Sequence, residues 1–564
     1  MNHEIINQEK QFSNGNIIVW GTQCTIDHNY SFRMEELREL LKSFISKNIL
    51  QECHPLFNEI IEHGLNVDKE PARDIKIEGD ELEKAIEAIE SESHKKYLVS
   101  SIQPGGSPAI SAIGGHHLKN RLKGFPEIYY CGLKTQSVEE YLTERSPGLA
   151  DLFSHARPIK KKSLTLGLEV GKYKLILSNK DGRLLTELVT KDPEEKSFEA
   201  EINAFRKTIS SEKNNPPKIL RELEDLIKKY HSSPREKIKK YVRDLKRELS
   251  GCHHSLEEDC QELEEIQSLP NLNDQDGSVR KKYRHGNTNF DQSLQSLEKR
   301  IGEYEGTINY QEYIQDLKGI IDEKSAPGKT VVVALGGLNK GSPKEYSALM
   351  KEIQKLKEEY LKKDISVKIF IGTNSFKNDP KEIKEYWNII KEADIVSMND
   401  AELNSIYSAL FGGDVTIPLG DKLRKLGAGT DFGDGLMICH SAEGAVIGSF
   451  GTFENIITSE QNIDLAAYLK KSLELAVDGT TYIYQNGIYP NDTAVRNYSQ
   501  NIRSRQESPF FVRFVHPGGH LANGIIETVA ANVGYPVGNL VGLGAVFDGI
   551  LLSYLFSNKN RGDA

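Results

Sequence analysis

A glycine-rich turn stands directly before the last apolar segment of the chain. Gly542, Leu543 and Gly544 open the stretch GLGAVFDGILLSYLF. This order of residues is typical of a helix N-terminus whose backbone N–H groups hold phosphate oxygens. The next residue is Ala545, which can neither accept a proton nor ligate a metal. The pattern therefore predicts an anion-binding turn that lacks an acid at its first helical position.

Four other short motifs follow predicted strands, where open α/β sheets bind their ligands. They are Asp27 in GTQCTID, Gly105 and Gly106 in GGSPA, Asn399 and Glu402 in SMNDAEL, and His440 in LMICH. Each motif also has a purely structural interpretation. Asp27 and Asn399 fit helix N-caps, His440 fits a core position, and the glycines fit ordinary turns.

The elements that must position these motifs fall into three segments. Residues 1–194 mix strands and helices, with NIIVWGT as a short strand ending at Gly21 and two or three antiparallel strands in KKSLTLGLEVGKYKLILSNKDGRLLTELVT. Residues 195–326 are charged amphipathic helices around the polar loop NLNDQDGSVRKKYRHGNTNF. Residues 327–564 alternate strands and helices, which predicts right-handed crossovers and a mostly parallel, doubly wound sheet.

The composition excludes several classes of protein. A chain of 564 residues has room for two or three domains. Its 72 basic and 82 acidic residues argue against a general affinity for nucleic acid or for an anionic membrane. The polar start and the scattered cysteines predict a cytoplasmic protein with reduced thiols. Cys252, His253, His254 and Cys260 match no standard zinc spacing.

In this order the motifs resemble those of the ADP-dependent sugar kinases, the glucokinase and phosphofructokinase branch of the ribokinase-like superfamily. The family turn G-x-N-x-N-x-D is partly matched through Gly21 and Asp27, and GGSPA matches a GGxAG turn. SMNDAEL keeps Asn399 and Glu402, CHS keeps His440, and GLGA stands where the family has GLGD. The resemblance is patchy over the first and third segments and absent from the second.

The resemblance implies a ribokinase-like fold with helices on both faces of the sheet, a small β lid and a long helical insertion. It also implies a nucleotide, ADP or ATP, bound with Mg²⁺ beside a small sugar-like substrate. Asp27, Gly105 and Gly106 would contact the substrate. Asn399, His440, Gly542, Leu543 and Gly544 would bind the nucleotide. Glu402 would organise the metal, through water.

Two departures from the family affect catalysis. Ala545 takes the place of the aspartate that serves as general base, so the catalytic position would consist of Gly542, Gly544 and Ala545, with backbone N–H groups but no proton acceptor. Lys368 and Phe370 align with a His-x-Glu strand whose glutamate helps to organise magnesium. Asp548 follows one helical turn later, and we expect it to face solvent or to cap the helix. His516 and His520 in VHPGGH are further candidate bases.

Two functions fit these observations. The first is a sugar or sugar-phosphate kinase whose activity is impaired by Ala545. The second is a non-catalytic pseudokinase, a nucleotide- or sugar-binding scaffold. In both cases residues 195–326 could contact a protein partner or a second copy of the chain.

Overall fold

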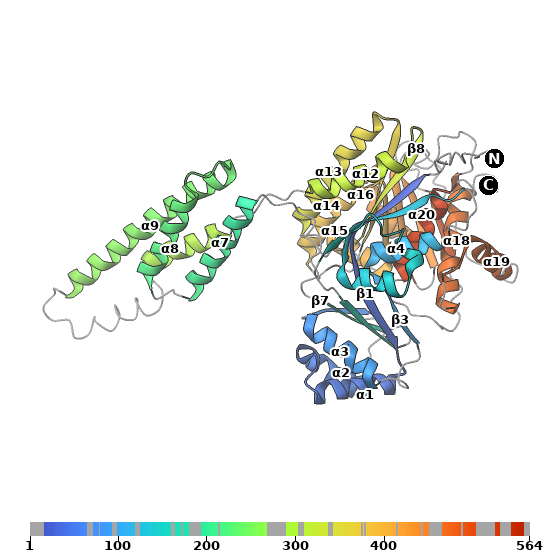
Figure 1. The fold of residues 1–564 in the computed structure, drawn as a ribbon, viewed down its shortest axis with the longest axis horizontal. Coiled ribbons are helices and arrows are strands. Elements are labelled where there is room, and N and C mark those ends of the chain that lie inside the picture. The colour runs from blue at the N-terminus through green and yellow to red at the C-terminus, as the bar shows by residue number, and fades with distance from the viewer. Residues whose placement is uncertain are drawn as a thin grey trace, which may run out of the picture. The chain divides into compact units, whose positions relative to one another are not determined.

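The computed structural model describes residues 16–64, 72–77, 79–92, 99–118, 124–159, 164–170, 173–179, 193–211, 215–267, 289–302, 310–336, 342–373, 376, 379–412, 416–441, 444–450, 465–486, 489–503, 525–530 and 543–557. Within these ranges the chain is an α/β protein with a large, mostly parallel sheet (Figure 1). This confirms the fold class predicted from the alternation of strands and helices.

The larger sheet, here called the main sheet, has the order β13-β12-β11-β10-β9-β8-β1-β4-β5 among the described residues. All strands from β11 to β5 run parallel, whereas β12 and β13 are antiparallel to their neighbours. Strands buried on both faces are nearly continuous apolar runs, as in KTVVVALG. The strands are β1 (Ile17–Ser31), β4 (Glu127–Thr135), β5 (Arg157–Ile159), β8 (Lys329–Gly336), β9 (Ile365–Gly372), β10 (Ile395–Asn399), β11 (Gly435–Ser441), β12 (Gly444–Phe450) and β13 (Ile525–Ala530).

A second sheet, here called the small sheet, has the order β3-β1-β6-β7-β2. Its other strands are β2 (Ala72–Ile77), β3 (Val99–Gly105), β6 (Leu164–Val170) and β7 (Tyr173–Asn179). Three helices pack on one face and share a core with it: α1 (Met34–Ser46), α2 (His54–His63) and α3 (Gly79–Glu92). β6 and β7 form the predicted antiparallel hairpin. The third strand expected near residues 184–190 lies outside the described residues.

Strand β1 belongs to both sheets. Residues 17–24 pair with β4 of the main sheet, and residues 25–31 pair with β3 of the small sheet. The predicted end of the strand at Gly21 is therefore wrong, because the residues beyond it find partners in a second sheet. The chain bends instead at Thr22, whose φ of 109° is unusual for a β-branched residue. Its hydroxyl donates to the carbonyl oxygen of Gly336 at 3.0 Å.

Helices cover both faces of the main sheet, as predicted. On one face a single core joins alternate residues of the strands, such as Trp20 and Phe370, to α4, α18 and α20. The opposite face is covered by α12 to α16 (Figure 1). The helices and turns of this part are α4 (Ser107–Leu118), α5 (Gln136–Glu144), α12 (Gln311–Lys324), α13 (Pro343–Leu361), α14 (Pro380–Ile390), α15 (Asp400–Phe411), α16 (Leu419–Gly429), α18 (Leu465–Asn486), α19 (Asp492–Arg503), α20 (Leu543–Leu555), η1 (Gln51–Cys53) and η2 (Pro147–Leu149).

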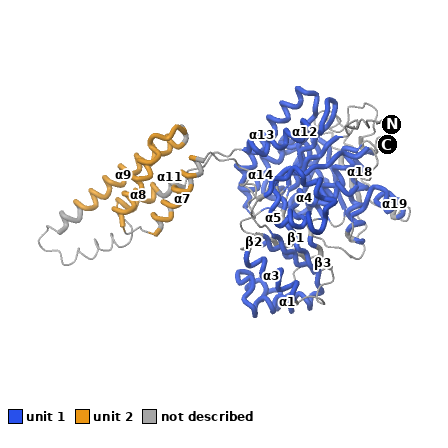
Figure 2. The backbone as a smooth tube through the Cα atoms, viewed as in Figure 1, with its two compact units in different colours: residues 1–189, 310–564 blue, residues 190–309 orange. Residues whose placement is uncertain are grey.

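The chain divides into two compact units (Figure 2). Unit 1 contains residues 1–189 and 310–564, and unit 2 contains residues 190–309. Unit 2 is helical in its described residues, with α7 (Pro193–Ser211), α8 (Pro216–Tyr230), α9 (Glu236–Gln267) and α11 (Asn289–Gly302) around a core of its own. Such a separate core is what amphipathic helices form when their apolar faces meet. Most of the predicted polar loop, residues 271–290, lies outside the described residues.

The cysteine and histidine cluster of unit 2 is part of this helical packing. Cys252 is buried in the core, and the ring of His253 lies 3.2 Å from the carboxylate of Glu224. The His254 ring lies 3.2 Å from the carboxylate of Glu258. All six cysteines of the chain lie within the described residues, and none of them forms a disulfide.

Helix α12, which the sequence analysis placed in the helical insertion, lies in unit 1. Arg157 of β5 donates hydrogen bonds to Glu312 and to Asp316 on this helix. The apolar face of α12 is buried as well, including Leu317 and Ile320. The helical segment therefore ends before α12, and the predicted boundary at residue 326 is too late.

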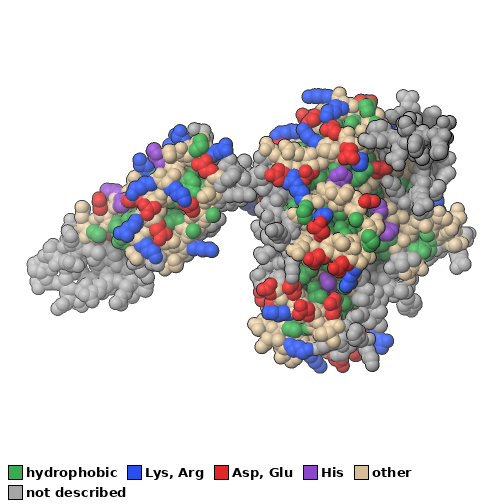
Figure 3. All heavy atoms as spheres, in the orientation of Figure 1, with side chains coloured by type: hydrophobic (Ala, Val, Ile, Leu, Met, Phe, Trp, Pro, Cys, Tyr) green, Lys and Arg blue, Asp and Glu red, His purple; other side chains and the backbone are tan. Residues whose placement is uncertain are grey.

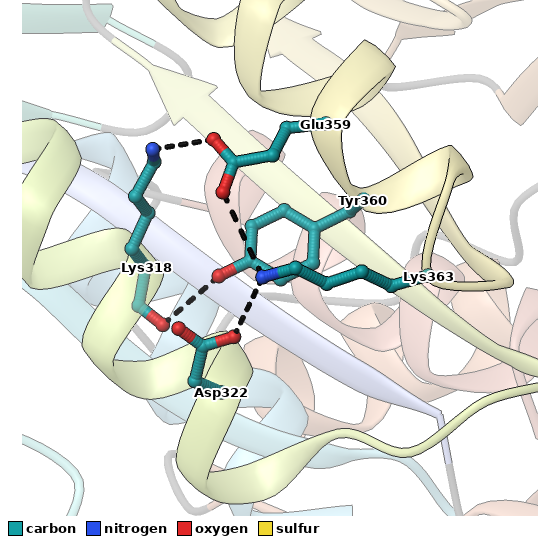
Figure 4. Close-up of polar contacts among 5 residues, drawn as sticks. All are labelled: Lys318, Asp322, Glu359, Tyr360 and Lys363. Atoms are coloured by element: carbon teal, nitrogen blue, oxygen red, sulfur yellow. Dashed lines mark hydrogen bonds and ion pairs between the residues drawn. The ribbon is translucent and has the colours of Figure 1, made fainter.

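A second group of contacts ties α12 to α13 (Figure 4). The ammonium of Lys318 pairs with Glu359, and its carbonyl oxygen accepts a hydrogen bond from Tyr360. Lys363 pairs with Glu359 and with Asp322. Half-exposed ion pairs contribute little individually, so this network mainly specifies how the two helices align.

Charged side chains of both signs are interspersed over the face of each unit seen in Figure 3. With a net charge of -10, such mixing leaves no broad basic area on that face. In the described part of the chain, no helix combines the length and the apolar character needed to cross a membrane.

Candidate functional site

Helices α4 and α20 pack side by side in the same direction. Ser111 donates from its hydroxyl to the carbonyl oxygen of Ala545 at 2.7 Å. One turn on, a Cβ added to Gly549 would lie 1.9 Å from the carbonyl oxygen of Ser111. A Cβ on Gly115 would lie 2.7 Å from the Ser553 hydroxyl. Along this contact the residue numbers of α4 and of α20 increase in the same direction. The two helices are therefore parallel, and their N-termini adjoin.

Two helix N-termini therefore meet at one edge of the main sheet. α4 begins after Gly105 and Gly106, and α20 begins at Leu543 and Gly544. Each terminus presents the positive end of a helix dipole at this edge. The two adjoining termini form a place that favours an anion such as a phosphate group.

Asp27 lies directly against the start of α4. A Cβ built on Gly105 would lie 1.9 to 2.2 Å from the carboxyl atoms of Asp27, so only glycine fits there. Asp27 is buried and sits inside β1, opposite Gln103 of β3. It is therefore not a helix N-cap, because β1 continues through it into the small sheet. The pKa of Tyr489 is raised first by burial, then by Tyr141, and least by the charge of Asp27.

Asn399 and Glu402 form the start of α15. The Asn399 side chain accepts from the backbone N–H of Glu402 at 2.8 Å, and its own backbone N–H donates to the Glu402 carboxylate at 2.9 Å. This reciprocal pair is a capping box, so the structural interpretation of Asn399 as an N-cap is correct. Both residues nevertheless stand at the carboxyl end of β10, where a ligand would lie.

Glu402 is almost fully buried and accepts two further hydrogen bonds. Thr373 donates from its hydroxyl at 2.6 Å, and the Asn399 side-chain amide donates at 2.8 Å. Burial raises the pKa of Glu402, although these hydrogen bonds act in the opposite direction. The carboxylate is thus held rigidly at the ends of β9 and β10.

His440 lies next to the glycine turn of α20. It pairs in register with Asn399, across from β10. A Cβ on Gly544 would meet the His440 ring at 2.6 Å, and the ring centroid lies 5.1 Å from that of Phe547. A glycine at position 544 therefore allows the imidazole to approach the helix N-terminus. His440 is only half-buried, so it is not a fully enclosed core residue.

The structure contradicts the prediction that Asp548 faces solvent or caps the helix. It is buried, and Ser397 of β10 donates its hydroxyl to the Asp548 carboxylate. A Cβ built on Gly372 would lie 3.2 Å from the other carboxylate oxygen. Burial raises the pKa of Asp548 to about 8, and the charge of Glu402 adds to this effect. The prediction failed because α20 is apolar on every side, so a polar residue within it is enclosed.

The two residues aligned with a His-x-Glu strand lie two positions apart on β9, and therefore on the same face of that strand. Phe370 is part of the core and its ring meets that of Trp20 edge-on at 5.4 Å. Lys368 is half-buried, and burial lowers its pKa. Gly542, His516 and His520 lie outside the described residues.

Ala545 is buried at the first turn of α20, and its carbonyl oxygen accepts the Ser111 hydrogen bond described above. The structure thus brings together Asn399, Glu402, His440 and Gly544 at neighbouring strand ends. Asp27, Gly105 and Gly106 stand at the adjoining start of α4. Asp548, expected from the sequence to face solvent or to cap the helix, is buried beside these strand ends; its signal was a lone carboxylate within a uniformly apolar helix.

Comparison with known proteins finds similarity in structure. No protein-family model matches the chain, and no curated protein matches it in sequence. A hypothetical ADP-dependent phosphofructokinase from Pyrococcus horikoshii OT3 is 12% identical, with a TM-score of 0.47 over 96% of this chain and 98% of that chain. An ADP-dependent kinase in complex with fructose-6-phosphate and ADPbetaS is 9% identical, with a TM-score of 0.48 over 97% of this chain and 95% of that chain.

A third solved structure, the adenosine kinase of Anopheles gambiae, is 9% identical, with a TM-score of 0.34 over 87% of this chain and 96% of that chain. Two of these three structures carry the description ADP-dependent.

The described residues suit a magnesium ion better than a metal that needs many protein ligands. Among them no three His, Cys, Asp or Glu side chains are grouped to hold a metal ion. Mg²⁺ usually takes one or two carboxylates and completes its shell with water and phosphate oxygens. Glu402 and Asp548 are two carboxyls at the same sheet edge, where the charge of Glu402 helps to raise the pKa of Asp548, so the residues present fit this ion.

Proposed function

We propose that the protein binds ADP or ATP with Mg²⁺ at the carboxyl edge of the main sheet, next to a small sugar or sugar phosphate. We further propose that it transfers a phosphoryl group slowly or not at all. The observation that carries this proposal is the parallel packing of α4 and α20, whose N-termini adjoin. Two parallel helix dipoles whose positive ends adjoin favour the charge of a polyphosphate.

Each group would have a separate task in this arrangement. Leu543 and Gly544 would hold phosphate oxygens through backbone N–H groups, together with Gly542. Asn399 and His440 would contact the nucleotide. On the other side Asp27 would accept hydrogen bonds from substrate hydroxyls, and the Gly105–Gly106 turn would approach the substrate with its backbone.

Glu402 would hold Mg²⁺, which supplies neutralisation of phosphate charge when it is bound. The chain's own contribution is to orient this carboxylate, since Thr373 and Asn399 fix both of its oxygens. Oε2 of Glu402 accepts two hydrogen bonds, and Oε1 accepts one. Oε1 therefore keeps a lone pair for a metal or a metal-bound water.

Ala545 supports weak turnover or none. A positioned general base typically contributes about 10²- to 10⁴-fold in rate, and alanine supplies no such group. The same observation favours the alternative, a pseudokinase that binds nucleotide or sugar without reacting them. Contact of the helical segment with a partner remains a prediction from its sequence.

The first experiment is calorimetry with ADP, ATP and AMP, each with and without Mg²⁺, on the full chain. We expect ADP or ATP to bind, and binding to be tighter with the metal. Sugars and sugar phosphates would then be titrated into the nucleotide-loaded protein. The absence of binding by any nucleotide would overturn the proposed site.

The second experiment restores the missing acid. Ala545→Asp should raise sugar-dependent phosphoryl transfer by up to about 10²- to 10⁴-fold in a coupled assay. Ala545→Asn is the matched control, because it adds a side chain of the same size that cannot act as a base. Brisk turnover by the unaltered protein would contradict the role given to position 545. If only the Phe370→Glu, Ala545→Asp double variant gains activity, the acid missing from β9 is needed as well.

A further inference from the structure

Helix α9 of unit 2 presents a continuous exposed stripe to solvent. On its other side Ile238, Leu245 and Cys252 are buried in the core of unit 2, against α8 and α11 (Figure 2). Because an α-helix repeats every 3.6 residues, the exposed positions between them line up along one face. That face, here called the α9 stripe, consists of Lys239, Lys240, Arg243, Lys246, Arg247, Ser250, Gly251, His253, His254, Glu257, Glu258 and Gln261. It is roughly 33 Å long at about 1.5 Å per residue.

The charges of the α9 stripe are separated by sign. In its N-terminal half every charged member is basic, from Lys239 to Arg247. In its C-terminal half the acidic members are Glu257 and Glu258, and the sequence of α9 adds three more glutamates after them. The middle consists of small residues, and a Cβ added to Gly251 would meet nothing within 4 Å. The stripe thus has a basic end, an acidic end and an open centre.

This separation of charge is unfavourable within one chain. Lys239 with Arg243, and Arg243 with Arg247, are like charges four residues apart, which destabilise a helix. Asp244 offsets part of this repulsion, at 3.9 Å from Arg247. The dipole of a helix also favours acids at its N-terminus and bases at its C-terminus, whereas the last turn of α9 holds glutamates and no base. Solubility does not require this order, because mixed signs would serve it as well, so the order indicates a partner outside the chain.

We infer that the α9 stripe binds the same stripe of a second copy of the chain, with the two helices antiparallel. A stripe with one basic and one acidic end is complementary to itself in this direction, whereas a parallel pair would bring like charges together. With a two-fold axis near Gly251, Lys246 and Arg247 of each copy face Glu257 and Glu258 of the other. The absence of a side chain at Gly251 lets the helices approach closely at the centre. A two-fold axis is also the commonest symmetry of homodimers.

The acidic end distinguishes a second copy from other partners of the basic end. A nucleic acid or an anionic membrane would be attracted by the bases from Lys239 to Arg247 and repelled by the glutamates that follow. A second copy uses both ends, and it needs no other protein to supply the matching order of charges. This inference is independent of the proposed function, because no residue of unit 1 takes part in it.

The test follows self-association of the full chain by sedimentation velocity, without nucleotide. Each sample is measured in about 0.1 M and about 1 M NaCl, between which the Debye length falls from about 10 Å to about 3 Å. One stripe variant, Lys246→Glu with Arg247→Glu, reverses part of the basic end. The other, Glu257→Lys with Glu258→Lys, reverses part of the acidic end.

The matched control is Arg221→Glu with Lys228→Glu, which reverses two exposed bases of α8. It changes the net charge by the same amount as the first stripe variant, on another helix of unit 2. Circular-dichroism melts confirm that every variant is folded.

We expect the unaltered chain and the control to dimerise in the lower salt and to separate in the higher salt, where the charges are screened. Each stripe variant should weaken dimerisation by at least about 10-fold, because like charges then face each other. An equimolar mixture of the two stripe variants should recover dimers, since acids again face bases at both contacts.

An unaltered chain that stays monomeric in the lower salt would overturn the inference, as would a dimer that neither stripe variant weakens. A monomeric chain that binds heparin through Lys246 and Arg247 would assign the basic end to a polyanion and overturn the second copy as its partner. The nucleotide site is judged separately by calorimetry, so failure of either proposal leaves the other standing.

Discussion

Two buried carboxyls at the edge of the main sheet rest against glycines in similar ways. Asp27 lies on Gly105 at the start of α4, and Asp548 lies on Gly372 at the end of β9. The supports differ, because Asp27 projects from a strand shared by two sheets, whereas Asp548 projects from an apolar helix. In both places a side chain on the glycine would compete with the carboxyl for space.

The difference shows which kinds of site residue a sequence reveals. Asp27 follows an apolar strand and stands before a glycine motif, so its place near a ligand could be proposed from the pattern. Asp548 has no such flanking signal, and its apparent position one turn beyond Ala545 suggests a solvent-facing residue. It is a buried acid because α20 packs against α4, α18 and the sheet, where its carboxyl meets Ser397 of β10 and Gly372 of β9.

The largest effect on stability should come from removing the Asp548 charge. The folded protein holds this proton up to about pH 8, whereas the unfolded chain loses it near the ordinary value for aspartate. Stability therefore falls as the pH rises from about 4 to about 8. Asp548→Asn should flatten this fall and gain on the order of 2–5 kcal/mol at pH 8, with little change at pH 4. Urea unfolding at pH 4, 6 and 8 measures the unfolding free energy of the parent and of Asp548→Asn. If this free energy depended on pH in the same way in both proteins, the result would contradict the burial of Asp548.

The next largest effect on stability is expected at Gly105, the glycine that the Asp27 carboxyl contacts. Gly105→Ala should cost about 1–3 kcal/mol of unfolding free energy, because the new methyl group overlaps the Asp27 carboxyl. Gly319→Ala is the control, since nothing lies within 4 Å of a Cβ there. Asp27→Ala combined with Gly105→Ala should recover most of the lost stability by making room. Denaturant unfolding of all four proteins decides whether the overlap is the cause.

A smaller change in stability, with a clear change in binding, is expected for Asp27 alone. Asp27→Ala should weaken the binding of the sugar-like substrate by about 10- to 100-fold, the value of a hydrogen bond to a charged group. Asp80→Ala, an exposed acid on α3, serves as the control. Calorimetry with the nucleotide-loaded protein reports the affinities. Equal affinity in Asp27→Ala and the parent would remove Asp27 from the substrate site.

The smallest effect is expected from removing unit 2. A short Gly/Ser linker in place of residues 190–309 should leave a cooperative melt and unchanged nucleotide binding, because unit 2 has its own core. Extending the deletion to residue 326 should destabilise the rest, since it removes α12 and the Arg157 contacts. Scanning calorimetry compares the two deletions. An insoluble product from the shorter deletion would show that the units depend on each other.

Periodicity alone predicted the α/β class, the parallel main sheet and the helical segment. Its failures share one physical cause, which is pairing between distant segments. The end of the first strand was misplaced because Gly21 can bend a strand as well as end it, and the partner β3 is not evident locally. The boundary at residue 326 was misplaced because α12, like the unit 2 helices, is a charged amphipathic helix. Only its contacts with β5 and α13 assign α12 to unit 1.

The double membership of β1 has a consequence for the order of folding during synthesis. Thr22 meets Gly336 across 314 residues, so the first half of β1 has β4 on one side early but waits for β8 on the other. At about 5–20 residues per second this delay is roughly 15–60 s. The small sheet needs only residues up to Asn179, and unit 2 needs only its own helices. We expect both to gain hydrogen-exchange protection earlier than the main sheet in pulse-labelled refolding, so that the second half of β1 is paired on both sides before its first half is.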